Sequence, residues 1–138
     1  MHLDPADENI AHLLKRRLSG PVTMLNMLRF RETADYRGYP DLDPGHPISG
    51  RDAYDRYIEH TLPFLEASGG SLLLLGDGGH FFVGPPEERW DLVMLVRQAS
   101  IEDFFAFASD EAYLDGIGHR AAALVDSRLL PIEERPIG

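Results

Sequence analysis

Three segments of this chain alternate as β-strands do, yet they are apolar at both sets of alternating positions. The segments are VTMLNMLRF (22–30), SLLLLGD (71–77) and WDLVMLVRQ (90–98). In the first, Met24 and Leu28 point to one side, whereas Leu25 and Met27 point to the other. A sheet built from such strands needs apolar cover on both faces, which constrains the fold more than any other feature.

The order of predicted elements indicates the fold class. Helices are predicted over 4–18, 49–70, 100–109 and 111–125, and a last strand over 126–134. We expect Pro63 to kink or split the second helix. After the first helix the order is β-α-β-β-α-β, which is typical of a ferredoxin-like α+β fold with a four-stranded antiparallel sheet. We therefore expect an N-terminal helix in residues 1–20 and a single ferredoxin-like domain in 21–138.

The second face of this sheet needs a partner. The fold's own helices cover one face, and the other would be an apolar patch larger than monomers usually expose. A second copy packed sheet against sheet is the simplest cover, so we expect a homodimer. The alternative is that the short N-terminal helix folds over this face.

Composition excludes several classes of protein. Thirteen Lys and Arg stand against 23 Asp and Glu, and the net charge of −10 disfavours nucleic acid and anionic membranes as partners. The chain has no cysteine, so disulfides and thiolate ligands are excluded. The start lacks the apolar core of a signal peptide, and no apolar run approaches the roughly 20 residues of a membrane span. The cytoplasm is the expected location.

Several blocks in order resemble a known family. They are VTMLNMLRFRE, SGRDAYDRY, ASGG, ERWDLVMLVRQAS and AYLDGIGHRAAALVDSRLL, within residues 21–130. The pattern resembles the domain-of-unknown-function 1330 family, in the dimeric α+β-barrel superfamily. That superfamily includes cofactor-free monooxygenases, lactone isomerases and haem-binding proteins. Two features depart from the family: Ala99 replaces a usual proline, and the 31–49 loop is more elaborate. The positions that match the family's blocks are Asn26, Arg29, Trp90, Arg97, His119, Arg120, Asp126 and Arg128.

Polar residues are expected to converge at one end of the sheet. The last strand is antiparallel to the first, so Arg128 near its start should lie near Arg29 at the end of the first strand. Trp90 opens the third strand, at that same end. Convergent polar groups beside an aromatic wall are typical of a ligand pocket. His119, Arg120 and Asp77 are expected at this end as well.

Arg120 admits two interpretations. It falls on the buried side of the last helix, so it needs a partner. In one interpretation it pairs with Asp126 and pins the helix to the strand. In the other, Arg120 and Arg128 bind a carboxylate or enolate. We expect an Arg120–Asp126 pair, with Arg128 and His119 facing the ligand.

Asn26 and His119 are the remaining candidates. Asn26 is an amide among apolar residues, and it either bridges to a neighbour or orients a substrate carbonyl. His119 is the candidate general acid or base, because histidine titrates near neutral pH. The histidines show no metal-ligand spacing, so we expect neither a metal nor a bound cofactor.

Two functions from different classes fit these residues. One is a metal-free enzyme of the isomerase, lyase or cofactor-free oxygenase type, acting on a small carbonyl or carboxylic acid in a barrel pocket. The other is a non-catalytic homodimeric binding module for a hydrophobic metabolite or haem. Both make a small molecule and a second copy of the chain the expected partners.

Overall fold

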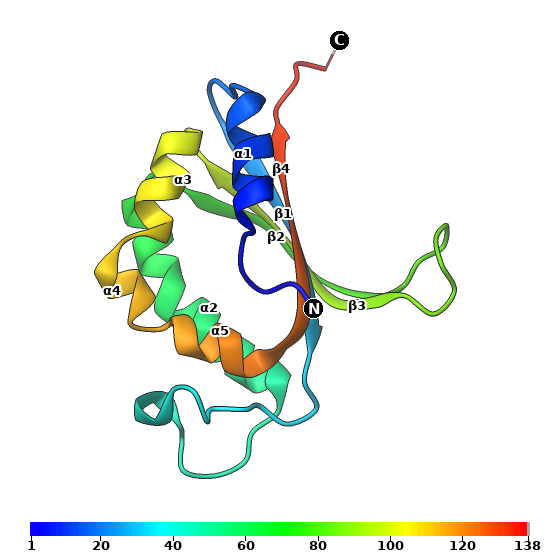
Figure 1. The fold of residues 1–138 in the computed structure, drawn as a ribbon, viewed down its shortest axis with the longest axis vertical. Coiled ribbons are helices and arrows are strands. Elements are labelled where there is room, and N and C mark those ends of the chain that lie inside the picture. Colours follow the sequence, from blue (N-terminus) through cyan, green and yellow to red (C-terminus); the bar gives the residue numbers. More distant parts are fainter. Residues whose placement is uncertain (138) are drawn as a thin grey trace.

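A computed structural model describes residues 1–137 of the chain. One antiparallel sheet holds four strands in the order β2-β3-β1-β4. The strands are β1 (Val22–Phe30), β2 (Ser71–His80), β3 (Arg89–Gln98) and β4 (Leu124–Glu133). The helices are α1 (Asp7–Lys15), α2 (Gly50–Ala67), α3 (Ile101–Ala108), α4 (Glu111–Leu114) and α5 (Ile117–Ala123), with a short 3-10 turn at Pro40–Leu42. This is the predicted ferredoxin-like α+β fold (Figure 1).

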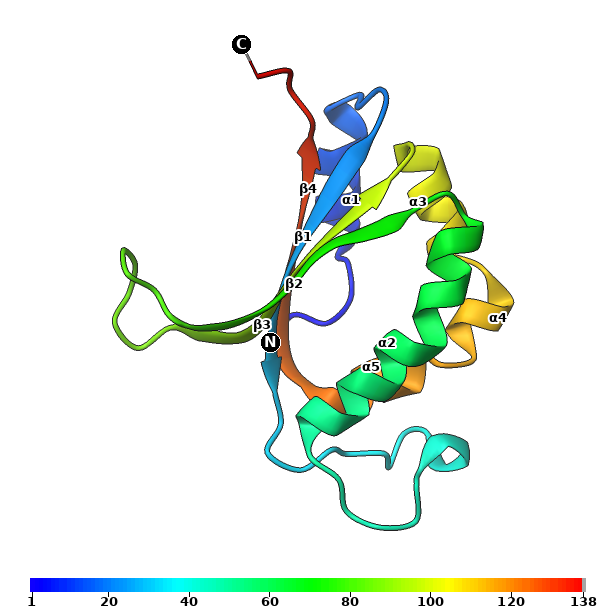
Figure 2. The same ribbon diagram turned by 180° about the vertical axis from the view of Figure 1, so that it is seen from behind.

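The helices α2, α3, α4 and α5 cover one face of the sheet (Figure 2). Beneath them Met24, Leu28 and Leu124 are almost wholly buried, and Tyr54 of α2 packs among them. Ser49 and Ser100 cap α2 and α3, each accepting a hydrogen bond from a backbone N–H three residues later. The core therefore lies between α2 and the central strands.

Several element boundaries differ from the prediction. Helix α2 continues through Pro63 without a break. The last predicted helix is two helices, because the chain turns at Gly116 between α4 and α5. Strand β4 begins at Leu124, and β2 extends to His80. The extended β2 and β3 form a hairpin that projects beyond the body of the domain, away from the helices (Figures 1 and 2).

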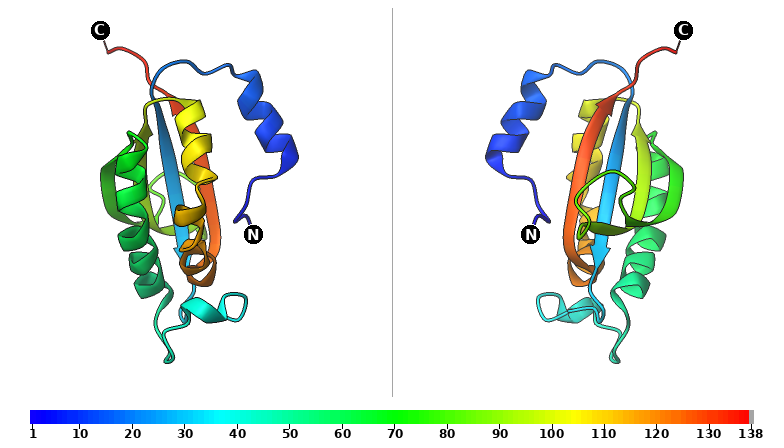
Figure 3. Two further views of the ribbon diagram at one scale, coloured as in Figure 1. Left: turned by 90° about the vertical axis from the view of Figure 1, so that its left-hand side faces the viewer. Right: turned by 90° about the vertical axis from the view of Figure 1, so that its right-hand side faces the viewer.

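The N-terminal helix does not cover the second face of the sheet. Figure 3 shows α1 beside the edge strand β4, and its apolar side chains Ile10 and Leu13 line a cavity together with Phe104 and Phe105 of α3. The alternative in which this helix covers the bare face is therefore wrong. All nine residues of α1 remain at least partly exposed.

The second face carries a row of leucines across all four strands. In the strand registers Leu130 pairs with Leu25, Leu25 with Leu95, and Leu95 with Leu74. Directly paired residues share a face, and this face is opposite to buried Met24 and Leu28. Leu130 and Leu74 are 54% and 47% exposed. We call this leucine row and its neighbours the open face.

Candidate functional site

A large cavity lies where the N-terminal segment passes β4. It has a volume of about 720 Å³. Its walls come from residues 2–16, from α3, and from the junction of α5 with β4. The apolar wall consists of Leu3, Pro5, Ala6, Ile10, Leu13, Phe104, Phe105, Ala108, Leu129 and Pro131. The polar lining residues are His2, Asp4, Asn9, His12, Arg16, Arg120, Ser127 and Arg128, of which Asp4 is the one acidic residue.

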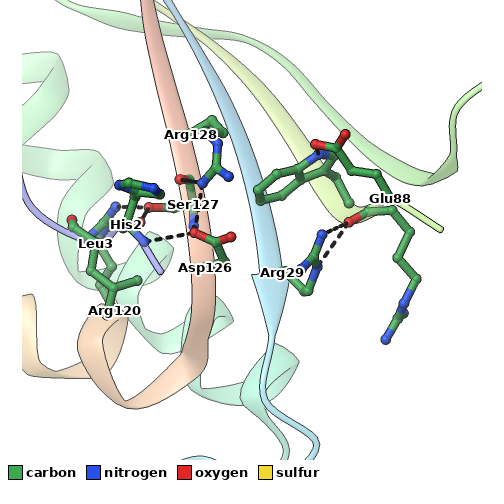
Figure 4. Close-up of polar contacts among 10 residues, drawn as sticks. His2, Leu3, Arg29, Glu88, Arg120, Asp126, Ser127 and Arg128 are labelled. Atoms are coloured by element: carbon green, nitrogen blue, oxygen red, sulfur yellow. Dashed lines mark hydrogen bonds and ion pairs between the residues drawn. The ribbon is translucent and has the colours of Figure 1, made fainter. Parts of the chain in front are cut away.

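Arg120 lies at the polar end of this cavity, partly buried. Its Nη1 donates to the carbonyl oxygen of Leu3 at 2.8 Å, and its Nη2 donates to Oγ of Ser127 at 3.2 Å (Figure 4). Both acceptors are neutral. Among residues 1–137 no carboxylate lies within ion-pair distance of Arg120, because each of the six ion pairs joins other residues. Arg120 is therefore a cation that only neutral groups partner.

Asp126 pairs with Arg128, and the predicted Arg120–Asp126 pair is wrong. Its Oδ1 lies 2.7 Å from Nη1 of Arg128. It also accepts from the backbone N–H groups of His2 at 2.8 Å and Ser127 at 2.9 Å. Burial by itself would raise the pKa of Asp126, but these hydrogen bonds and the Arg128 charge lower it to about 2. Asp126 is therefore an anion at neutral pH.

The N-terminal segment reaches this same cluster through its backbone. The His2 N–H donates to Asp126, the His2 carbonyl accepts from Oγ of Ser127, and the Leu3 carbonyl accepts from Arg120. Figure 4 shows these contacts side by side at the start of β4. Sequence reasoning did not identify His2, Leu3 or Ser127. The sequence does contain one signal that the N-terminal segment packs against the domain. It is the apolar stripe of the first predicted helix, because such a stripe must face other apolar groups.

Trp90 lies between two arginines, as expected from the strand order. The guanidinium carbons of Arg29 and Arg128 lie 4.8 Å and 5.0 Å from the centre of its ring. Trp90 is buried, and its Nε1 donates to Glu88 at 3.2 Å. Arg29 also donates to the carbonyl oxygen of Arg89. Arg128 thus connects the cavity, Asp126 and Trp90.

Two other predicted site residues, Arg97 and Asn26, do not line the cavity, and neither do Arg29 and Trp90. Arg97 pairs with Glu134 at 2.7 Å and is opposite Thr23, at the far end of the sheet from Arg29. Asn26 faces the helices, with Leu129 and Met94 as its strand neighbours, and its Nδ2 donates to the Met24 carbonyl at 3.3 Å. Asn26 therefore lies next to the cavity wall at Leu129 without lining the cavity.

His119 faces the long loop, and its predicted place beside Arg128 is wrong. Its Nδ1 lies 2.7 Å from the hydroxyl of Tyr36. Burial lowers the pKa of His119 below its usual value, and the nearby Arg56 and His60 lower it further. Tyr36 also lines a second, open cavity of about 370 Å³ under the 31–49 loop. His119 and Arg120 are adjacent in α5, but His119 faces the 31–49 loop and Arg120 faces the cavity beside β4.

Within residues 1–137, no group of three or more histidines or carboxylates is placed to hold a metal ion. In the same range, no helix is both long enough and apolar enough to cross a membrane.

Solved structures share this fold. The crystal structure of RPA0582 from Rhodopseudomonas palustris, a protein of unknown function, is 31% identical, with a TM-score of 0.82, over 99% of this chain and 98% of that one. Its methylated form gives 32% identity and a TM-score of 0.83, over 99% and 97%. A dimeric protein of unknown function and ferredoxin-like fold from Bacteroides fragilis is 11% identical, with a TM-score of 0.52, over 85% and 99%. No protein-family model and no curated protein matches the chain, so the resemblance to the domain-of-unknown-function 1330 family stays a prediction.

Proposed function

Because the chain belongs to the same family as RPA0582 of Rhodopseudomonas palustris, whose function is unknown, we propose a function from this chain's own cavity. The cavity beside β4 binds a small carboxylic acid that carries an apolar tail. The carboxylate takes the donors of Arg120, and the tail lies between α1 and α3.

The observation that carries this proposal is the unneutralised charge of Arg120. A partly buried guanidinium is stabilised most by an anion that accepts two of its hydrogens. Arg120 has neutral acceptors instead, at Leu3 and Ser127. Arg128 lines the same cavity, but Asp126 already neutralises it. Arg16 lines the cavity without an ion pair as well, but it is exposed and donates to the Pro131 carbonyl. Arg120 therefore supplies the partly buried positive charge that an incoming carboxylate needs.

The apolar wall of the cavity determines the apolar part of the ligand. Ile10 and Leu13 of α1 face Phe104 and Phe105 of α3 across the cavity, and none of the four is buried. An alkyl chain between them would remove apolar surface from water at about 25 cal/mol per Å². A ligand with a charged head and a short aliphatic tail therefore matches both ends of the cavity.

The test compares hexanoate with hexan-1-ol by isothermal titration calorimetry. Wild type should bind hexanoate, and the neutral alcohol should bind more weakly. Arg120→Gln should weaken hexanoate binding roughly tenfold or more, the value of a hydrogen bond to a charged group. Arg97→Gln is the matched control, because Arg97 lies at the opposite end of the sheet. Equal hexanoate affinity in wild type and Arg120→Gln would contradict the proposal.

The open face supports a second proposal, a homodimer. The leucine row Leu130–Leu25–Leu95–Leu74 is self-complementary under a two-fold axis, and no other part of the described chain covers it. The β2–β3 hairpin projects on the same side as this face (Figure 2), and Phe82, in the loop that joins the two strands, is fully exposed. The dimeric neighbour from Bacteroides fragilis is consistent with this arrangement. The metal-free enzyme considered from the sequence stays a prediction. Its candidate general acid or base, His119, lies away from the cavity beside β4.

A further inference from the structure

The polar end of the cavity is filled by the chain itself. His2 presents its backbone N–H to Asp126 and its carbonyl oxygen to Ser127, and the next carbonyl, of Leu3, lies on Arg120 (Figure 4). No side chain of the segment takes part in these three hydrogen bonds. The cluster therefore recognises a general chemical pattern. A hydrogen-bond donor is attached to one carbon atom, and the first acceptor oxygen is attached to the neighbouring carbon atom.

We infer that the cavity takes a 2-hydroxy carboxylic acid, and that His2 is the occupant it displaces. This rests on the proposed function. The N–Cα–C=O unit of His2 has the same connectivity as the HO–C–C=O unit of a 2-hydroxy acid. The hydroxyl donates to Asp126 in place of the His2 N–H. One carboxylate oxygen accepts from Ser127, and the other accepts from Arg120 in place of the Leu3 carbonyl.

The charges of the cluster favour a hydroxyl over an ammonium at the donor position. Arg128 lies 2.7 Å from Asp126 and already neutralises it, and Arg120 adds a second positive charge nearby. The charges of Arg120 and Arg128 would repel a cationic amine at the donor position, whereas a neutral hydroxyl only donates its hydrogen bond to the Asp126 oxygen. Asp126 remains ionised at neutral pH, since its pKa is lowered to about 2, so its oxygen stays available as an acceptor.

The contacts that hold the N-terminal segment are few enough for His2 to be displaced from the cavity. All nine residues of α1 are at least partly exposed. Beyond the His2 and Leu3 contacts, the segment is held by Arg16, which donates to the Pro131 carbonyl at 2.8 Å, and by the Ser19 N–H, which donates to Glu133 at 3.4 Å. When the chain itself occupies the site, the apparent affinity for the ligand equals the intrinsic affinity multiplied by the fraction of molecules in which the site is free. Weakening the His2 contact should therefore strengthen ligand binding.

The experiment titrates full-length protein with hexanoate, 2-hydroxyhexanoate and 2-aminohexanoate by calorimetry. The hydroxy acid should bind roughly threefold to tenfold more tightly than hexanoate, the net value of one hydrogen bond. The amino acid should bind more weakly than the hydroxy acid. In Asp126→Ala the preference for the hydroxyl should vanish. In Asp126→Asn, which keeps an acceptor oxygen and guards against simple loss of fold, the preference should remain.

A second variant tests the displacement. His2→Pro removes the backbone N–H that donates to Asp126 and leaves the groups of the cavity's own strand unchanged. Its affinity for 2-hydroxyhexanoate should rise a fewfold over wild type. Leu14→Ala, at an exposed position of α1 outside the cavity lining, is the control and should bind as wild type does.

The outcomes separate the two proposals. Equal binding of hexanoate and 2-hydroxyhexanoate would overturn this inference and leave carboxylate binding intact. Tighter binding of the amino acid, or weaker binding by His2→Pro, would also overturn the inference alone. If neither acid binds wild type, the proposed function fails and the inference fails with it.

Discussion

Oδ1 of Asp126 lies 2.7 Å from Nη1 of Arg128, and this ion pair decides the chemistry of the whole cluster. It neutralises the arginine that also stacks on Trp90. Arg16 and Arg120 are then the cavity arginines without a carboxylate partner in the described chain, and of these Arg120 is the partly buried one. We therefore assign Arg128 a structural role and propose Arg120 as the ligand-binding arginine, which reverses the roles expected from sequence.

The Asp126 pair should make stability depend on acid. The folded-state pKa of Asp126 is about 2 and its ordinary value is 3.8, so the stabilisation is complete above pH 4 and is lost as the pH falls toward 2. Over that range the unfolding free energy of wild type should fall about 1–2 kcal/mol more than that of Asp126→Asn. Urea unfolding at several pH values measures this. Parallel pH profiles for the two proteins would show that the pair contributes nothing.

His119 should give a second pH dependence, in a separate window. Burial lowers its folded-state pKa below the usual 6.5, so the folded state disfavours the proton. The contribution of neutral His119 is complete above pH 6.5 and is lost as the pH falls below that value. The melting temperature should drop more between pH 8 and pH 5 for wild type than for His119→Gln. An equal drop in both proteins would contradict a lowered pKa.

The prediction from sequence succeeded for the fold because alternation and helical spacing are local. The ion-pair partner of Asp126 is also a local feature, but the sequence analysis chose Arg120 instead of Arg128. Residues two apart in a strand share a face, so Arg128 was the natural partner of Asp126, whereas Arg120 lies in the preceding helix. The site's other partners, His2 and Leu3, contact β4 and α5 respectively across more than 100 residues, and no local pattern encodes such contacts.

Gly118 should be intolerant of a side chain. A Cβ at this position would lie 2.5 Å from the Tyr39 ring and 2.7 Å from the Leu42 side chain, so these two side chains of the 31–49 loop would have to shift. Gly118→Ala should cost about 1–3 kcal/mol of unfolding free energy, a typical value for overpacking. Gly79→Ala is the matched control, since a Cβ there meets no atom within 4 Å. Equal melting temperatures for the two variants would contradict the observed packing.

The open face should hold two copies together. Sedimentation equilibrium at micromolar concentration should give about twice the chain mass of 15.5 kDa. Leu25→Glu and Leu130→Glu place a charge in the leucine row, and each should shift the protein toward monomer. Leu14→Glu, on exposed α1, should stay dimeric. Monomeric wild type would contradict sheet-to-sheet packing.

The most direct test of the central claim is a crystal structure with 6-bromohexanoate, with bromine located by its anomalous scattering. We expect the carboxylate on Arg120 and the bromine between α1 and α3, near Leu13 and Phe104. Calorimetry on the same preparation establishes that the acid binds in solution. Bromine ordered elsewhere on the protein, with no acid at Arg120, would contradict the assignment of this cavity as the carboxylate site.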